Sequence, residues 1–188
     1  MPFIMDFTVD GGCRPRVGSR RRTVGGAAAV LHTRNVGHRL RTRTLLPTPR
    51  AQPTNQRAEL TAMILALEWA LARYRQLGSR PRLVVRIRTD SRYAVGCLSG
   101  VWAFRWDRNG WRNARGVEVA NRDLIERALN LADVIEDMDG TVTYEWIPRH
   151  ENEFADRVCR QVLQDACEQL LREEEEEEEE EDWLYWSD

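Results

Sequence analysis

Residues 57–98 read RAELTAMILALEWALARYRQLGSRPRLVVRIRTDSRYAVGCL and contain the helix–strand–helix pattern that decides the fold class. Over residues 57–77 the apolar side chains recur at three- and four-residue steps, which predicts an amphipathic helix that ends at Gly78. The apolar, β-prone run at 83–89 predicts a strand, and residues 91–98 predict a short helix. Helices on both sides of a strand indicate an α/β domain.

The rest of the chain adds strands and helices around this unit. Before it, three β-prone runs predict strands at 3–9, 24–32 and 37–46, and the basic stretch 14–22 is expected to be a loop. After it, a polar and aromatic segment precedes a predicted helix, strand and last helix at 119–134, 141–147 and 151–172. Three meandering strands followed by alternating units predict a mixed five-stranded sheet with helices on both faces.

Acidic residues are concentrated at the C-terminus. Residues 173–188 hold 11 acidic residues and no basic one, so residues 1–172 hold 28 basic residues against 19 acidic ones. A basic body favours a polyanionic partner, although a merely soluble basic surface is the ordinary alternative. Nine consecutive glutamates repel one another, so we expect a single folded domain over 1–172 and a disordered tail over 173–188. This tail either keeps the protein soluble or mimics a polyanion, with Trp183, Tyr185 and Trp186 docking on the domain.

The cysteines and the hydropathy pattern indicate an intracellular protein. The four cysteines form no CxxC pair and the three histidines complete no zinc-binding spacing, so we expect free thiols in a reducing compartment. No apolar run approaches the length of a membrane span, and the N-terminus shows no signal peptide. The nucleus and the cytoplasm both remain open.

Four acidic residues stand in settings that favour a metal site. Asp10 and Asp90 each follow a predicted strand, Glu59 opens a predicted helix, and Asp156 lies one turn into the last one. Carboxylates are hard oxygen ligands that suit Mg²⁺ or Mn²⁺, and such a cluster is typical of two-metal phosphoryl transfer. Each acid also has an ordinary interpretation, as a strand-end cap, a first-turn residue favoured by the helix dipole, or a solvated helix residue.

Five motifs in the chain resemble those of a known enzyme family. They are DGGC at 10–13, TNQRAEL at 54–60, TDSRYAV at 89–95, NGWRNARGVEVANRDLI at 109–125 and NEFAD at 152–156. In this order they resemble type 1 ribonuclease H, from about Phe3 to about Leu171. The resemblance implies the ribonuclease H fold and an endonuclease that hydrolyses the RNA strand of RNA–DNA hybrids, leaving 5′-phosphate and 3′-hydroxyl ends. We expect a monomer that acts on this hybrid and uses two Mg²⁺ ions, or Mn²⁺ in their place.

The resemblance also implies a role for each acid. Asp10 is expected to bridge both metals, Glu59 and Asp90 to complete one site, and Asp156 to help hold the other. Most family members place a histidine ten residues before the last aspartate, whereas WIPRHENEFAD places His150 only six residues before it. This shortened loop leaves Arg149 and His150 as alternative catalytic residues near the scissile phosphate, and an ordinary surface role is open for either.

Substrate-binding residues follow from the same resemblance. Asn55 and Gln56 match residues that read the minor groove and the RNA 2′-hydroxyls, which distinguish RNA from DNA. Thr54 and Asn121 match a pocket that binds a DNA phosphate, although Gln52 replaces an arginine that the family often adds there. Helix capping by Thr54 or Asn55 is the ordinary alternative, and capping and substrate contact can coexist.

A second group of residues matches the basic handle of some family members, here residues 102–117. Trp102 and Trp106 match an aromatic platform along the DNA strand, and Trp111 is expected to pack the base of the handle. Positive charge around them comes from Arg105, Arg108, Arg112 and Arg115. A place in the core is the alternative for the two platform tryptophans.

Two other functions remain open on the sequence. The first is a catalytically weak nucleic-acid-binding module of the same fold, which the presence of all four carboxylates argues against. The second is a nuclease that cuts another duplex, such as double-stranded RNA or a Holliday junction. The TNQ motif and the basic handle favour the hybrid.

Overall fold

The computed structural model describes residues 1–33 and 37–186, with the backbone alone at residues 16, 101, 104 and 181–186. The strands are β1 (Phe3–Val17), β2 (Arg22–Thr33), β3 (Gly37–Leu45), β4 (Leu83–Thr89) and β5 (Thr141–Trp146). The helices are α1 (Asn55–Arg75), α2 (Arg92–Leu98), α3 (Val101–Arg108), α4 (Arg122–Asp137) and α5 (Glu153–Trp186), with a 3-10 turn, η1 (Arg149–Glu151), before α5.

The strands form one mixed sheet in the order β3-β2-β1-β4-β5. β1 pairs with β2 and β2 with β3 in antiparallel fashion, whereas β4 lies parallel to both β1 and β5. The predicted five-stranded mixed sheet is therefore confirmed. β1 and β4 pair in parallel as far as Thr8 and Arg88, so Asp10 and Asp90, each two residues further on, fall on the same side of the molecule.

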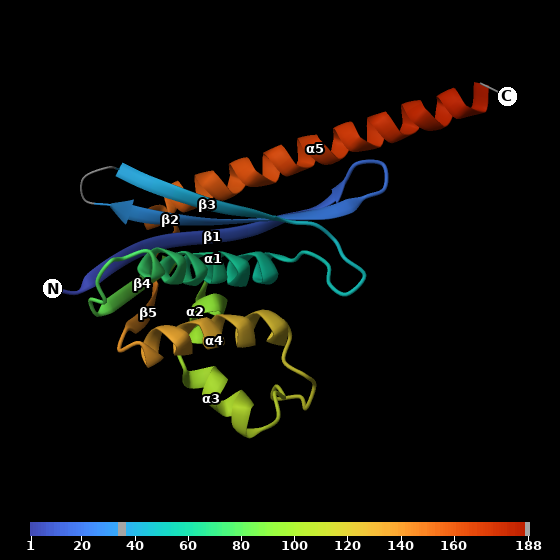
Figure 1. Cartoon of the computed structure of the whole chain (residues 1–188). Helices are drawn as coiled ribbons and strands as arrows, with labels where there is room; N and C mark the ends of the chain where they lie inside the picture. The colour runs from blue at the N-terminus through green and yellow to red at the C-terminus, as the bar shows by residue number, and fades with distance from the viewer. Residues whose placement is uncertain (34–36, 187–188) are drawn as a thin grey trace.

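Helices cover both faces of the sheet, as Figure 1 shows. α1 packs between the sheet and α4 on one face, and α5 crosses β1, β2 and β3 on the other. Residues 24–31 of β2 are buried without interruption because helices cover this strand from both sides. The main core joins Phe7, Leu60, Ile64 and Ile87 from β1, α1 and β4.

A glycine on β2 lets α5 approach the sheet closely. A Cβ atom at Gly26 would lie 3.1 Å from Leu163 Cγ and 3.2 Å from Val162 Cγ1. The Cys159 thiol contacts the carbonyl oxygen of Gly26 at 3.4 Å. This contact fixes the first turns of α5, which carry the last of the four acids.

β3 is polar and exposed along most of its length. Arg41 stacks over the ring of Trp69 with its guanidinium carbon 4.9 Å from the ring centroid. Arg43 pairs with Glu68 of α1 at 3.0 Å. Together with Arg39, these side chains place three arginines at alternate positions of this strand.

Two elements differ from the sequence prediction. The stretch expected as a loop at 14–22 is largely a hairpin, because β1 continues to Val17 and pairs with β2 as far as Arg22. The polar segment after α2 contains the eight-residue helix α3, which no pattern predicted. Its short length and the glycine that follows at Gly110 concealed the helical period.

The acidic tail also differs from the prediction, since α5 continues as a helix to Trp186 instead of becoming disordered after Arg172. Glu174 is 6% exposed and accepts hydrogen bonds from the backbone N–H of Ser19 at 2.8 Å and from its hydroxyl at 2.9 Å. Glu177 pairs with Arg20 at 2.5 Å. Contacts with this arginine-bearing hairpin offset part of the repulsion between the glutamates.

The far end of the tail passes the hairpin and leaves the body of the molecule (Figure 1). The side chains of Trp183, Tyr185 and Trp186 lie outside the described residues, so their docking stays a prediction. Despite its length, α5 is too polar to cross a membrane, and no other helix in the described part of the chain is long and apolar enough.

Candidate active site

All four predicted carboxylates meet at one hollow of the surface. Asp10 lies on β1, Asp90 directly follows β4, Glu59 lies near the start of α1, and Asp156 lies on α5. Together they line a hollow of about 440 Å³. Four separate elements therefore bring together acids that are far apart in the sequence.

The approach of α1 to β1 depends on the residue after Asp10. A Cβ atom at Gly11 would lie 2.2 Å from the carbonyl carbon of Ala58 and 2.3 Å from the backbone nitrogen of Glu59. Only glycine fits there, so the backbone of α1 rests directly on β1. Asn55 strengthens this contact, because its Oδ1 accepts a hydrogen bond from the backbone N–H of Cys13 at 2.8 Å.

Asn152 holds Asp90 in position, a role that sequence reasoning did not assign although this residue opens the NEFAD motif. Its side chain is 1% exposed, and its Nδ2 donates to Asp90 Oδ1 at 2.8 Å and to the carbonyl oxygen of Val9 at 3.0 Å. The indole N–H of Trp146 donates to the carbonyl oxygen of Asp90 at 3.0 Å. On the other side of the site, the Ser91 hydroxyl donates to Glu59 Oε2 at 2.6 Å.

Asp156 is 7% exposed and is held by two arginines. Arg149 contacts its Oδ1 at 3.3 Å, and Arg160 pairs with its Oδ2 from one turn further along α5. Both arginines line the hollow. His150 is not among the lining residues and lies 3.8 Å from Glu151. The structure therefore places Arg149 beside the carboxylates and adds Arg160, which the motifs gave no reason to select.

Burial and neighbouring negative charge raise the pKa of two of the four carboxylates, Asp10 and Glu59. Burial raises the pKa of Asp10, and the nearby charge of Asp90 raises it further. Burial also raises the pKa of Glu59, against the opposing hydrogen bond from Ser91, and repulsion from Asp10 and Asp90 adds to the increase. A cation bound between these groups would relieve that repulsion.

The donor set fits a hard divalent cation, because it consists of carboxylate oxygens that repel one another. As they stand, no three His, Cys, Asp or Glu side chains within the described ranges converge closely enough to hold an ion. Glu59, Asp90 and Asp156 are each hydrogen-bonded to protein groups. The oxygens of Asp156 that face Arg149 and Arg160 would be its ligands for an ion.

Acidification should remove activity and stabilise the metal-free fold. Because their pKa values are raised, Asp10 and Glu59 take up protons at a higher pH than ordinary carboxylates do. Between the ordinary and the raised pKa the folded state binds more protons than the unfolded state, so its stability rises as pH falls. The kcat/KM profile and melting curves in EDTA measure the two effects. An Asp10→Asn variant with the wild-type pH dependence of stability would contradict this origin.

The predicted substrate residues of α1 and α4 meet at Arg57. Thr54 caps α1, because its hydroxyl accepts from the Arg57 backbone N–H at 3.2 Å. The Arg57 guanidinium contacts Asn121 Oδ1 at 3.4 Å, and Asn121 Nδ2 donates to the Tyr93 hydroxyl at 3.0 Å. Gln56 is exposed on the first turn of α1. Capping by Thr54 is thus confirmed, and the contacts of these residues with nucleic acid stay predictions.

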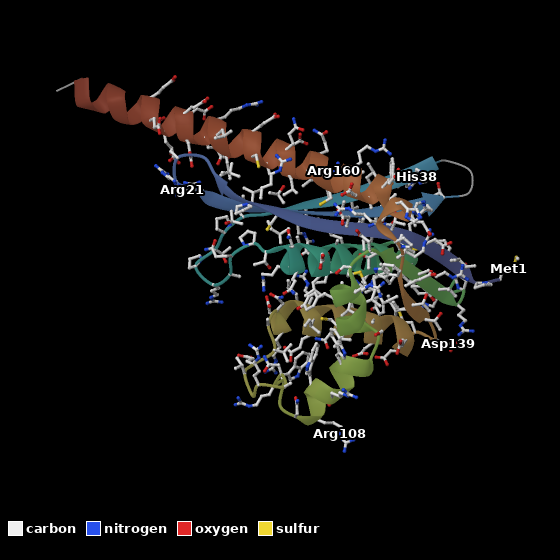
Figure 2. The ribbon with its side chains drawn as sticks, turned by 180° about the vertical axis from the view of Figure 1, so that it is seen from behind. Met1, Arg21, His38, Arg108, Asp139 and Arg160 are labelled. Atoms are coloured by element: carbon white, nitrogen blue, oxygen red, sulfur yellow. The ribbon has the colours of Figure 1, made fainter. Side chains whose placement is uncertain are left out.

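The three tryptophans of the handle lie in a row, and their side chains become progressively more buried from the solvent toward the core. Trp102 is 40% exposed, Trp106 is partly buried and Trp111 is 9% exposed, with 5.9 Å between neighbouring ring centroids. The expected packing of Trp111 is confirmed. Figure 2 shows Arg108 at the tip of the handle, on the opposite side of the sheet from Arg160 on α5.

Comparisons with known proteins agree with this geometry. The model of the RNase H family matches residues 4–164. The ribonuclease H of Mycolicibacterium gilvum is 35% identical over 170 residues, which cover 88% of this chain and 96% of that protein.

Two solved structures share the fold at lower identity. RNase H1 of Halobacterium salinarum has a TM-score of 0.58 at 22% identity, over 87% of this chain and 99% of that one. The foamy viral protease–reverse transcriptase in complex with an RNA/DNA hybrid has a TM-score of 0.59 at 17% identity, over 85% of this chain and 20% of that one. On its sequence and its fold, the chain belongs to the ribonuclease H family, in the type 1 branch.

Proposed function

We infer that this protein is an endonuclease that hydrolyses the RNA strand of RNA–DNA hybrids. The observation that carries this function is the convergence of four carboxylates from four elements on one hollow, in a member of the ribonuclease H family. A module that only binds nucleic acid has no need to keep four acids together against their mutual repulsion. The basic body supplies the attraction for the polyanionic substrate.

The acids have distinct roles in this proposal. Asp10 would be shared by two Mg²⁺ ions, Glu59 and Asp90 would complete one site, and Asp156 would serve the other. When bound, the ions make a water molecule nucleophilic and stabilise the leaving oxygen, which gives 5′-phosphate and 3′-hydroxyl ends. Asn152 and Ser91 keep two of these carboxylates in place through their hydrogen bonds.

The chain also supports a proposal for the oligomeric state and the cellular compartment of the enzyme. One chain supplies all four acids, which supports a monomer as the active form. All four cysteines are free thiols, which supports a reducing compartment such as the cytoplasm or the nucleus.

A cleavage panel tests the function. Labelled RNA–DNA hybrid, duplex RNA and duplex DNA are incubated with Mg²⁺, with Mn²⁺ or with EDTA, and the product ends are mapped. We expect cleavage of the hybrid's RNA strand alone, only with metal, and with 5′-phosphate ends. Cleavage of duplex RNA at a comparable rate would assign a different substrate, and binding of hybrid without cleavage would leave a binding module.

Arg149→Ala should slow steady-state turnover on the order of tenfold, because a charged hydrogen-bonding group beside the scissile phosphate is lost. His150→Ala is the matched control, since this neighbour is exposed and does not line the hollow. Its turnover should stay within about twofold of wild type. A larger defect in His150→Ala, at equal melting temperature, would reverse the assignment.

Trp102→Ala should raise KM about fivefold with little change in kcat, because an exposed ring far from the carboxylates loses about 1 kcal/mol of stacking. Trp106→Ala serves for comparison, since this partly buried ring also packs on the core. It should lower the melting temperature as well. Normal hybrid affinity in Trp102→Ala would remove this residue from the substrate surface.

A further inference from the structure

A second hollow, which we call the basic hollow, lies next to the carboxylates between β1 and α5. Its volume is about 500 Å³, and it is lined by Arg14, Glu153, Arg157, Arg160, Gln161 and Gln164. Five of these six residues lie at helical spacing on one face of α5, and Arg14 faces them from β1. Three guanidinium groups stand against a single carboxylate, so the hollow carries a net positive charge.

The basic hollow is continuous with the candidate active site. Arg14 and Arg160 line both hollows. Arg160 also pairs with Asp156, one of the four acids. A nucleic-acid strand that lies across the carboxylates can therefore continue over the basic hollow.

Two of the three arginines of the basic hollow are not engaged in ion pairs with residues that the structure describes. Within the described part of the chain, neither Arg14 nor Arg157 forms an ion pair with a carboxylate. Arg157 rests on the ring of Phe154, with its guanidinium carbon 5.4 Å from the ring centroid. This contact holds the side chain in place and leaves its N–H donors available.

We propose that the basic hollow binds a phosphate of the cleaved strand next to the scissile one, with Arg14 and Arg157 as its donors. This proposal rests on the proposed function and adds a subsite to it. Arginine presents a planar fork of donors that matches two oxygens of a phosphate, which suits a phosphodiester better than a carbohydrate or an apolar group. Arg160 would stand between this phosphate and the carboxylates, because it lines both hollows.

The test compares charged and neutral phosphates. Hybrids with one preferred cleavage position carry a single methylphosphonate in the RNA strand, one or two linkages to either side of that position. At one of these positions the neutral linkage should slow single-turnover cleavage by wild type about tenfold. Arg157→Gln should show the same loss on the unmodified hybrid and no further loss at that position.

Arg172→Gln is the matched control, because it makes the same change on an exposed arginine further along α5. It should keep the wild-type rate and the wild-type sensitivity to the neutral linkage. A methylphosphonate in the DNA strand should not distinguish wild type from Arg157→Gln. If Arg157→Gln remains as sensitive as wild type to the RNA-strand linkage, the subsite is wrong. If the two proteins differ only for a DNA-strand linkage, the hollow contacts the other strand and the proposal is equally wrong.

A binding measurement separates failure of this subsite from failure of the proposed function. Hybrid affinity is measured in EDTA over a range of salt concentrations, without any cleavage. Arg157→Gln should reduce the slope of log K against log salt by about one, as expected for one lost phosphate contact. An unchanged slope contradicts the subsite even where the wild-type enzyme cleaves hybrid. A reduced slope supports phosphate binding there even if the cleaved substrate proves to be a different duplex.

Discussion

Asp10→Asn should abolish cleavage while leaving the fold intact. The change keeps the shape of the side chain and removes one of the four carboxylates that line the hollow. Metal ions in such sites contribute several kcal/mol of transition-state stabilisation, so the loss of their shared ligand should lower kcat on the order of 10³-fold. Single-turnover cleavage of a labelled hybrid measures this effect.

Two further measurements make the Asp10→Asn result specific. In EDTA, the variant should melt at a higher temperature than wild type, because one of the mutually repelling charges is gone. Its affinity for hybrid in EDTA should be equal or higher for the same reason. Asp137→Asn, the same change at the exposed end of α4, should alter none of these quantities. Near-normal turnover by Asp10→Asn would contradict the assignment of a two-metal site.

Gly11→Ala should damage both stability and activity. The added methyl group would lie 2.2 Å from the carbonyl carbon of Ala58, and a backbone atom in a helix cannot move alone. The whole N-terminal part of α1 would have to shift away from β1, which typically costs about 1–3 kcal/mol of folding free energy. Because Glu59 and Asn55 move with this helix, turnover should fall on the order of 10²-fold through misplacement of about 1 Å.

The next residue provides the control for Gly11→Ala. A Cβ atom at Gly12 would lie 3.4 Å from Leu163 Cδ1, an ordinary contact with a side chain that can adjust. Gly12→Ala should therefore change the melting temperature little and keep most of the activity. Urea unfolding and kcat of both variants give the comparison. Equal effects of the two changes would show that the contact with Ala58 does not set the position of α1.

Periodicity and local composition predicted most of the fold. The features that they missed depend on partners distant in the chain. The helix at 57–77 and the strand at 83–89 appear within two residues of their predicted limits. The continuation of β1 beyond Asp10 could not be predicted locally, since Arg14 and the following proline are typical of a loop. In the structure Arg14 pairs with Val24 and, after an irregularity, Val17 pairs with Arg22. The extension of α5 past Arg172 likewise depends on the β1–β2 hairpin.

In the candidate active site, too, the sequence predicted the residues that local motifs mark and missed those that depend on distant partners. The motifs selected the four acids, which the structure brings together, and the shortened loop drew attention to Arg149. Asn152 was visible within a motif, but its hydrogen bond to Asp90 spans 62 positions and has no local signal. Arg160 lies one turn after Asp156, where an arginine on a helix surface is usually an ordinary solvated side chain.

β3 has a consequence for how these molecules behave toward one another. Within the part of the chain that the structure describes, it is an outermost strand of the sheet, so one side of its backbone pairs with no neighbouring strand. At an exposed edge strand of this kind, two copies of a protein can pair their sheets and begin to aggregate. Arg39, Arg41 and Arg43 lie along this edge. A second copy paired there would place its own arginines close to them. We therefore expect the arginines of β3 to disfavour pairing of two copies along this edge.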